Sequence, residues 1–335
     1  MKPSYIGGQA VMEGIMMRNG GKYAVGVRKP DQEIEVKVED YRSVFGNLKL
    51  MKLPIFRGVA SFVDSLVIGT KCLMYSASFF DDEEEEAERE KKKKKYTGSE
   101  EEILRQMEDD KKKQEKRDQM LLNVTMVFSV ILAVVLFMVL PYLIASLLRK
   151  LDVSEFGVTV AEAIVKMGLF LGYMLLISRM KDIQRTFMYH GAEHKCINCI
   201  ENGLELNVEN VMKSSRQHKR CGTSFLLLVM VVSVLMHFVF VLVPVLWMRV
   251  VGRILLIPVV AGVAFEFIRL AGKSEHPLVC AISKPGLALQ KLTTREPDES
   301  MVEVAIAAVE AVFDWKNYLR ENFGHKEFES EREAQ

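Results

Sequence analysis

The sequence predicts an α-helical membrane protein that crosses the bilayer about four times, with a small N-terminal β-hairpin and cytoplasmic amphipathic helices. Three observations support this fold class. Long apolar windows recur after Leu121, charged residues are concentrated in separate blocks, and residues 22–39 alternate apolar with polar side chains. The net charge of +1 is the sum of blocks of opposite sign. It therefore gives no indication of a nucleic-acid partner, and we expect none.

Residues 1–50 are predicted to form a glycine-rich segment followed by the β-hairpin. The segment places Gly7 and Gly8 beside polar residues in an apolar setting. Glycine lets the backbone approach a neighbour closely, but the spacing alone favours an ordinary glycine-rich turn that leads into a helix. The alternation within 22–28 and 33–39 then predicts two strands joined by a turn that contains proline and aspartate.

Residues 51–80 are predicted to form an amphipathic helix that lies at the membrane interface or packs against membrane helices. The stretch is apolar but carries Arg57, Asp64 and Lys71, whose spacing of seven places them on one stripe of a helix. Three charges make a lipid-facing span costly, so the interfacial location is favoured, with a span as the alternative. Residues 81–120 are mostly charged and predict a solvated linker.

Residues 121–272 are predicted to form a four-helix membrane domain. Each of its apolar windows is long enough to cross a hydrocarbon layer of about 30 Å. The windows are Leu121–Leu148, Phe156–Ser178, Ser224–Met248 and Val250–Ala271. Arg249 and Arg253 mark the predicted turn between the third window and the fourth. At the end of the fourth window, Glu266 is expected to pair with nearby Arg269.

The distribution of lysine and arginine predicts the orientation in the membrane. These residues are concentrated before the first window, between the second and the third, and after the fourth. The positive-inside rule therefore places both termini and the motif loop at 181–221 in the cytoplasm, with the protein in the inner (plasma) membrane. No apolar stretch follows Lys2, so no cleaved signal peptide is predicted.

Residues 273–335 are predicted to form cytoplasmic amphipathic helices and a polar tail. A short amphipathic helix is expected within 273–297, and Asp298 is a candidate N-cap of a last helix. One face of that last helix is apolar and should dock on the soluble layer. The face comprises Met301, Val304, Ala305, Ala308, Val309, Val312 and Phe313. The tail after His325 is polar.

The strongest chemical signal is the motif H-x-x-E-H formed by His190, Glu193 and His194. On a helix the two histidines lie on one face, and Glu193 lies between them on the same face. Two imidazoles at this spacing can chelate one cation, and an adjacent carboxylate can act as a base on metal-bound water. The order is inverted relative to the metalloprotease helix. The motif predicts a divalent metal, most simply zinc.

Two ligand sets remain open for this metal. One is C-x2-C at Cys196 and Cys199 followed by His218 and Cys221, which resembles a closed structural zinc site. The other combines the two motif histidines with His218 or Cys221, and leaves a position for water with the motif glutamate as the base. A closed site holds a fold, whereas an open site can do chemistry. The odd number of five cysteines argues against a disulfide framework and fits a reducing compartment.

Four motifs occur in order along the chain. They are Gly-Gly-Gln-Ala-Val-Met-Glu-Gly at 7–14, His-Gly-Ala-Glu-His-Lys at 190–195, Arg-Cys-Gly-Thr-Ser-Phe at 220–225 and Leu-Gln-Lys-Leu-Thr-Thr-Arg-Glu-Pro at 289–297. In these motifs the chain resembles the YqhQ-like group, a bacterial membrane family of unknown function whose members are labelled predicted metal-dependent enzymes. The resemblance extends over roughly residues 5–320. It implies a membrane protein with a metal and implies no known substrate.

The resemblance also bears on the choice of site residues. Further motif residues are Gln9, Glu13, Arg220, Glu266 and Arg295. The chain departs from the family pattern at Lys219, where the pattern has proline after the histidine, and Cys196 is not part of the pattern. The second departure weakens the C-x2-C ligand set. It favours a site built from the H-x-x-E-H motif and His218.

Two classes of function follow from these observations. The first is metal-dependent hydrolysis of a peptide or lipid-linked substrate at the cytoplasmic membrane surface. The second is a non-enzymatic membrane scaffold or assembly factor, in which the His and Cys cluster is a structural site. A transporter is disfavoured because few charges lie deep in the apolar windows. The expected partners are membrane lipids and other membrane proteins.

Overall fold

The computed structural model describes residues 2–46, 48–93, 100–239 and 246–325. Parts of three sequence predictions lie outside the described residues. These parts are 94–99 of the charged linker, 240–245 of the third apolar window and 326–335 of the polar tail. The chain divides into two compact units, and each is described by itself. The first comprises Met1–Phe79 and Met174–Gln335, and the second comprises Phe80–Tyr173.

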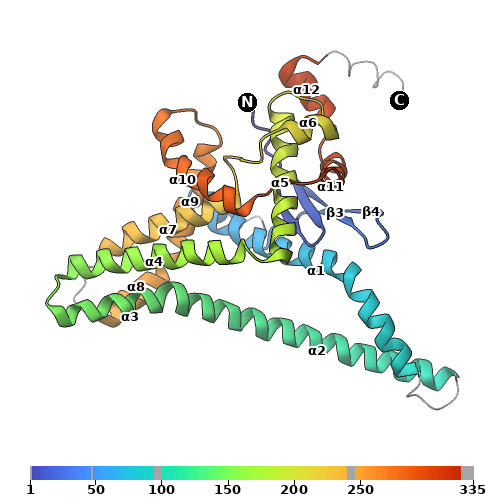
Figure 1. Ribbon diagram of the computed structural model, residues 1–335, viewed down its shortest axis with the longest axis horizontal. Coiled ribbons are helices and arrows are strands. Elements are labelled where there is room, and N and C mark those ends of the chain that lie inside the picture. Colours follow the sequence, from blue (N-terminus) through green and yellow to red (C-terminus); the bar gives the residue numbers. More distant parts are fainter. Residues whose placement is uncertain (1, 47, 94–99, 240–245, 326–335) are drawn as a thin grey trace. The chain divides into compact units, whose positions relative to one another are not determined.

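The first unit contains a four-stranded antiparallel sheet whose strands follow one another in sequence order (Figure 1). The strands are β1 (Gly7–Val11), β2 (Gly14–Asn19), β3 (Lys22–Arg28) and β4 (Ile34–Asp40). The predicted hairpin is the β3–β4 pair. The prediction that the glycine-rich segment turns into a helix is wrong, because β1 and β2 pair as a further hairpin. Four successive residues of β2, from Gly14 to Met17, are buried, so its sequence lacks the alternation typical of a strand with one exposed face.

Two helices pack against this sheet and close the core. They are α5 (Lys181–Glu201) and α11 (Glu299–Glu310). Ile15 and Met17 of the sheet are buried with Ile197 of α5 and Met301 of α11. The predicted N-cap is confirmed, since the Asp298 carboxylate accepts a hydrogen bond from the Met301 N–H at 2.9 Å. The predicted apolar face is buried in this core from Met301 to Val309, whereas Val312 and Phe313 follow the end of α11 and are partly buried against the core.

Two short helices complete the soluble layer, namely α6 (Val208–Lys213) and α12 (Trp315–Phe323). Helix α12 is not predicted from the sequence. Most of its residues are polar, and its buried positions are Trp315 and Leu319, one turn apart. A one-turn apolar pair is too short a pattern to distinguish from a polar tail.

Five helical segments of the described chain are long and apolar enough to cross a membrane. They are Phe56–Phe80, Met120–Leu151, Glu155–Ile177, Gly222–Val239 and Val251–Ala271. The prediction of a largely helical membrane protein is therefore supported. Four segments correspond to the predicted windows, and the fifth is the stretch for which an interfacial helix is favoured.

The second unit is helical, with a charged first part and apolar helices from Met120 onward. Its elements are the end of α1 (Phe56–Lys93), α2 (Glu100–Val134), a π-helical turn (Val135–Val139), α3 (Leu140–Ser146), a 3₁₀ turn (Leu147–Leu151) and most of α4 (Glu155–Ile177). Pro141 stands in the first turn of α3, directly after the π-helical turn. Proline lacks the N–H that would continue an α-helical ladder, which explains the change of helix type at this point.

Four helices follow the soluble layer of the first unit. They are α7 (Gly222–Val239), α8 (Leu246–Leu255), α9 (Ile257–Ala271) and α10 (Pro277–Thr293). α10 packs on α7 and α9 and confirms the predicted amphipathic helix. Arg249 and Arg253 lie within α8, so the prediction that they mark a turn is wrong. Within the described residues a helix break falls at Leu256, next to a proline in the first turn of α9, whereas the link between α7 and α8 lies outside the described residues.

The charged stripe of α1 faces the protein, as its spacing of seven predicts. Each of its three charges has a bonded partner. The partners are Glu266 for Arg57, Tyr41 and the Val44 N–H for Asp64, and Glu39 for Lys71. The predicted pairing of Glu266 with Arg269 is therefore wrong, because the Glu266 carboxylate of α9 binds Arg57 of α1 instead.

Candidate metal site

Helix α5 carries the H-x-x-E-H motif and is held against the segment that follows α10. A Cβ added at Gly191 would lie 2.0 Å from the carbonyl oxygen of Arg295, so the two backbones touch. The Arg295 N–H donates to the Phe187 carbonyl at 2.9 Å, and its guanidinium donates to the Ser178 carbonyl at 2.9 Å. Arg295, predicted as a motif residue, therefore fixes the start of α5.

Three donor atoms converge on one point at the α5 motif. Among the described residues, His190, His194 and Cys221 place one potential ligand atom each within 4.8 Å of one another. The Cys221 Sγ lies 3.3 Å from the His190 Nε2. Tetrahedral zinc with bond lengths of about 2.0–2.3 Å separates neighbouring donors by about 3.5 Å. The donor set and its spacing therefore fit a zinc ion.

Hydrogen bonds fix both motif imidazoles in the tautomer that a metal requires. The His190 Nδ1 lies 2.9 Å from the Thr293 carbonyl, and the His194 Nδ1 lies 2.7 Å from the Arg216 carbonyl. A carbonyl oxygen can only accept, so each Nδ1 carries the proton and each Nε2 presents a lone pair. An outer oxygen on the second ring nitrogen is the usual support of a metal-binding histidine.

His218 lies beside this group, outside the set of converging donors. Its Nδ1 is 2.9 Å from the Asn198 Oδ1, and the Asn198 amide nitrogen donates to the carbonyls of Ser215 and Gln217. The Asn198 oxygen must then accept, which leaves a lone pair on the His218 Nε2. That atom is buried and has no hydrogen-bond partner in the described part of the chain. Burial lowers the pKa of His218 well below its usual value, and the Arg220 charge adds to this shift.

The motif glutamate is buried at the junction of α5 and the sheet. The Glu193 Oε1 accepts a hydrogen bond from the Gly8 N–H at 3.1 Å, whereas Oε2 has no partner among the described residues. A Cβ at Gly8 would lie 2.5 Å from the Met16 carbonyl oxygen and 3.1 Å from the Glu193 Cδ. The glycine of the first motif therefore lets β1 reach the carboxyl group. Burial raises the pKa of Glu193 above its usual value.

The C-x2-C ligand set is not assembled. Cys196 and Cys199 are buried in the apolar core between the sheet, α5 and α11. Burial raises the pKa of the Cys196 thiol well above its usual value and that of Cys199 to about 11. All five cysteines of the chain are free thiols.

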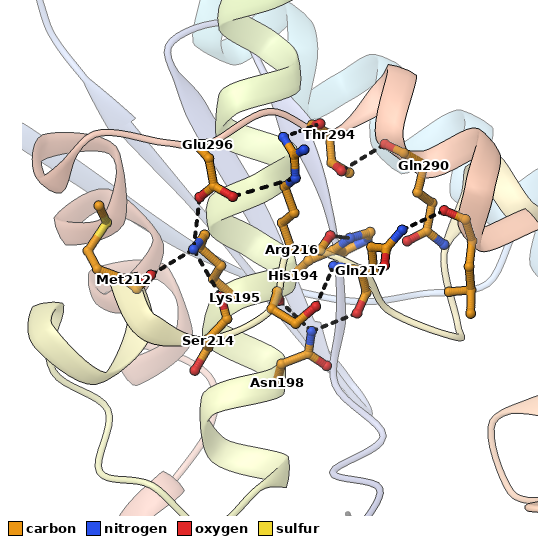
Figure 2. A network of polar contacts seen from close by, with 12 residues as sticks. His194, Lys195, Asn198, Met212, Ser214, Arg216, Gln217, Gln290, Thr294 and Glu296 are labelled. Atoms are coloured by element: carbon orange, nitrogen blue, oxygen red, sulfur yellow. Dashed lines mark hydrogen bonds and ion pairs between the residues drawn. The ribbon is translucent and has the colours of Figure 1, made fainter.

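A polar network ties the segment after α6 to α5 and to the segment after α10 (Figure 2). The Lys195 ammonium donates to the carbonyls of Met212 and Ser214 and pairs with Glu296 at 2.9 Å. Arg216, whose carbonyl holds His194, donates in turn to the Thr294 carbonyl at 3.1 Å. The segment that carries the Arg216 carbonyl is thus held both by Lys195 of α5 and by the segment after α10.

Gln290 of α10 clamps the backbone at His218. Its Oε1 accepts from the His218 N–H at 2.9 Å, and its Nε2 donates to the His218 carbonyl at 2.7 Å and to the Ser224 hydroxyl at 2.8 Å. Gln290 is completely buried. Gln290 lies within the motif at 289–297, but the sequence gives no sign of its role, because its partners lie far away along the chain.

The remaining predicted motif residues join elements away from the converging donors. Their partners are Gly69 of α1 for Gln9, Arg185 of α5 for Glu13, Glu201 for Arg220, and Arg57 for Glu266. Glu201 is almost fully buried and also accepts from the backbone and hydroxyl of Ser4. These residues position α5 and its neighbours and do not contribute to the donor set.

The comparisons with known proteins identify the family of the chain and leave its chemistry open. The chain is 37% identical over 308 residues to a protein of Bacillus subtilis (strain 168) described as "Uncharacterized protein YqhQ", covering 91% of this chain and 90% of that protein. No solved structure matches the chain significantly. Residues 53–315 match the family described as "Protein of unknown function (DUF1385)". The chain therefore belongs to the DUF1385 family.

Proposed function

We propose that the protein is a metal-dependent hydrolase of the membrane surface, with zinc held by His190, His194 and Cys221. The observation that carries the proposal is the convergence of two imidazole nitrogens and one sulfur within 4.8 Å. A nitrogen and sulfur donor set suits zinc, and three protein ligands leave a fourth position for water or substrate.

Glu193 is the general base of this proposal. Zinc in such a site polarises a carbonyl or phosphoryl oxygen and favours a water nucleophile at neutral pH. The Gly8 N–H holds one oxygen of the Glu193 carboxyl, which leaves Oε2 to accept the proton of the attacking water. Because burial raises the pKa of this carboxyl, its basicity lies closer to that needed at neutral pH.

The site is proposed to face the cytoplasm from the inner membrane, with both termini on the same side. The distribution of lysine and arginine around the apolar segments supports this orientation. The substrate is proposed to be peptide or lipid-linked. Lipids and other membrane proteins are the proposed partners.

The metal content of purified protein tests the metal site. We expect about one zinc per chain in the wild type and almost none in the double variant His190→Ala/His194→Ala, since removing two of three ligands abolishes chelation. His276→Ala is the matched control, because His276 is exposed at the start of α10, and should keep the metal. Equal, near-zero metal in the wild type and the double variant would end the proposal.

A structural metal site in a membrane scaffold is the second candidate function. It is favoured by the burial of the donors, since His194 is 1% and Cys221 3% exposed. Glu193→Gln separates the two functions while preserving the shape of the side chain. A hydrolase loses its cellular function and retains the metal, whereas a scaffold retains both. Complementation of a deletion strain together with metal content gives the answer.

A further inference from the structure

Two cavities meet at Lys219, just before α7. The first has a volume of about 60 Å³ and is lined mainly by polar residues, among them His218, Lys219, Arg220 and Lys273. The second has a volume of about 200 Å³ and lies between α7, α9 and α10. Because Lys219 lines both, the polar cavity and the second cavity are neighbours.

The polar cavity has the features of an anion site. Three cationic side chains line it, and Glu201, one of its two carboxylates, is already bonded to Arg220. The Lys219 ammonium contacts the Cys280 sulfur at 3.9 Å, a weak acceptor, so it keeps the capacity to bind an anion. The buried His218 Nε2 carries a lone pair and has no partner in the described chain, so it can accept a hydrogen bond from a hydroxyl group beside the anion but does not bind the anion itself. At about 15 Å³ for each water-sized group, the cavity accommodates a group the size of a phosphate.

The second cavity is an apolar groove at the edge of the membrane helices. Its lining includes Leu227, Leu228 and Val231 of α7, Phe267 and Ile268 of α9, and Ile282 of α10. The parts of α7 and α9 that line it belong to segments apolar enough to cross a membrane. A groove of this composition fits a hydrocarbon chain, and its lysine lies where a lipid headgroup would begin.

We propose that the paired cavities bind an anionic phospholipid, with the phosphate in the polar cavity and part of an acyl chain in the groove. The charge of the first cavity and the apolar lining of the second select this occupant over a soluble phosphate or a neutral lipid. His218 lines the polar cavity, and its ring centroid lies 5.8 Å from that of His194. Anionic phospholipid is therefore also the substrate class of the candidate metal site, and this assignment rests on the proposed hydrolase function.

Native mass spectrometry of the full-length protein in detergent tests the lipid site. Dioleoylphosphatidylglycerol should bind at least about tenfold more tightly than dioleoylphosphatidylcholine, because basic side chains near the membrane surface favour net negative charge. Lys219→Gln/Lys273→Gln should remove most of this preference. The matched control Lys22→Gln/Lys213→Gln removes two exposed charges elsewhere and should retain it.

A second pair of variants tests the groove. Val231→Trp fills the groove and should weaken binding of dioleoylphosphatidylglycerol about tenfold or more, as burial of several methylene groups is lost. Leu226→Trp is the control, because Leu226 is exposed on α7 and does not line the groove. Displacement of the lipid by an equal concentration of glycerol phosphate would show that the groove contributes nothing. That result, or equal binding by the Lys219→Gln/Lys273→Gln variant and the wild type, would overturn the proposal.

The same measurement on His190→Ala/His194→Ala separates the lipid site from the metal. Lipid binding should persist in this variant, since neither histidine lines the two cavities. Absence of zinc from the wild type with selective lipid binding intact would end the hydrolase proposal and leave the lipid site standing. Zinc in the wild type without selective lipid binding would end the lipid-site proposal and leave the metal site standing.

Discussion

Gly191 allows a close backbone contact that positions the candidate site, because it has no side chain. It stands directly after His190, and its hydrogen atoms allow the Arg295 carbonyl to touch α5. We expect Gly191→Ala to destabilise the protein by about 2 kcal/mol, because the new methyl group meets backbone that cannot yield easily. The zinc content should fall as well, since the segment carrying Thr293 is displaced from the His190 Nδ1.

Thermal unfolding and metal content of Gly191→Ala check this prediction. Gly222→Ala is the control, because Gly222 adjoins Cys221 but a Cβ there meets nothing within 4 Å. That change should be neutral or slightly stabilising, as alanine is favoured over glycine by up to about 1 kcal/mol in a helix. Equal stability of Gly191→Ala and the control would contradict the close contact at α5.

At the scale of residues, the sequence predicts the parts of the site that depend on local spacing. His190, Glu193 and His194 share a face of α5 because of helical geometry alone. The sequence does not reveal the bonding partners of Gly8, Asn198 and Gln290, since these partners are distant along the chain. The Gly8 N–H reaches Glu193 over 185 positions, and Gln290 reaches His218 over 72. One sequence without its contacts holds no signal for such pairs.

At the scale of elements, the contacts of helix α1 as a whole determine whether it counts as a membrane span. By length and composition, its first part is apolar enough to cross a bilayer. Yet Asp64 binds Tyr41, Lys71 binds Glu39, and the Ser76 hydroxyl accepts from the Met12 N–H at 3.1 Å. These contacts, distributed over more than three turns, place α1 along the sheet, whose strand β4 has exposed polar residues. A helix bound to such a sheet is expected at the membrane surface.

Epitope tags test this location of α1. If α1 lies on the surface, a tag at the N-terminus and a tag inserted between residues 95 and 96 are both on the cytoplasmic side. Antibody should then bind both tags only after the membrane is permeabilised, whereas a tag inserted after Asp152 should be accessible without permeabilisation. Opposite accessibility of the first two tags would show that α1 spans the membrane.

The elements differ in how far sequence predicts them. Long apolar windows predict four of the membrane segments, because length and composition suffice for a span. The β3–β4 hairpin follows from alternation, but β1 and β2 do not, as β2 is buried along most of its length. The break between α8 and α9 lies beside a proline, whereas the arginines that suggest a turn lie within α8. Local signals therefore succeed where one face of an element is exposed, and fail where both are covered.

At the scale of the whole molecule, the candidate metal links segments that are distant in sequence. His190 and His194 come from α5, Cys221 precedes α7, and the carbonyl that holds His190 belongs to Thr293. An ion bound to all three donors adds a cross-link between α5 and the start of the α7–α10 helices. A ligand that binds only the folded state stabilises it by an amount that grows with the logarithm of the free ligand concentration divided by the Kd.

Removal of the metal should therefore lower the stability of the entire first unit. With free zinc at about a thousand times its Kd, the stabilisation is about 4 kcal/mol, and its loss corresponds to a fall in Tm on the order of 8–16 °C for a unit of this size. Thermal unfolding of detergent-solubilised protein before and after chelation measures this effect, and re-addition of zinc should restore the original Tm. His190→Ala/His194→Ala should unfold at the same temperature with or without the chelator, because it has no site to empty. An equal response of wild type and variant would mean that the chelator acts elsewhere, and the three donors would then hold no metal that matters to the fold.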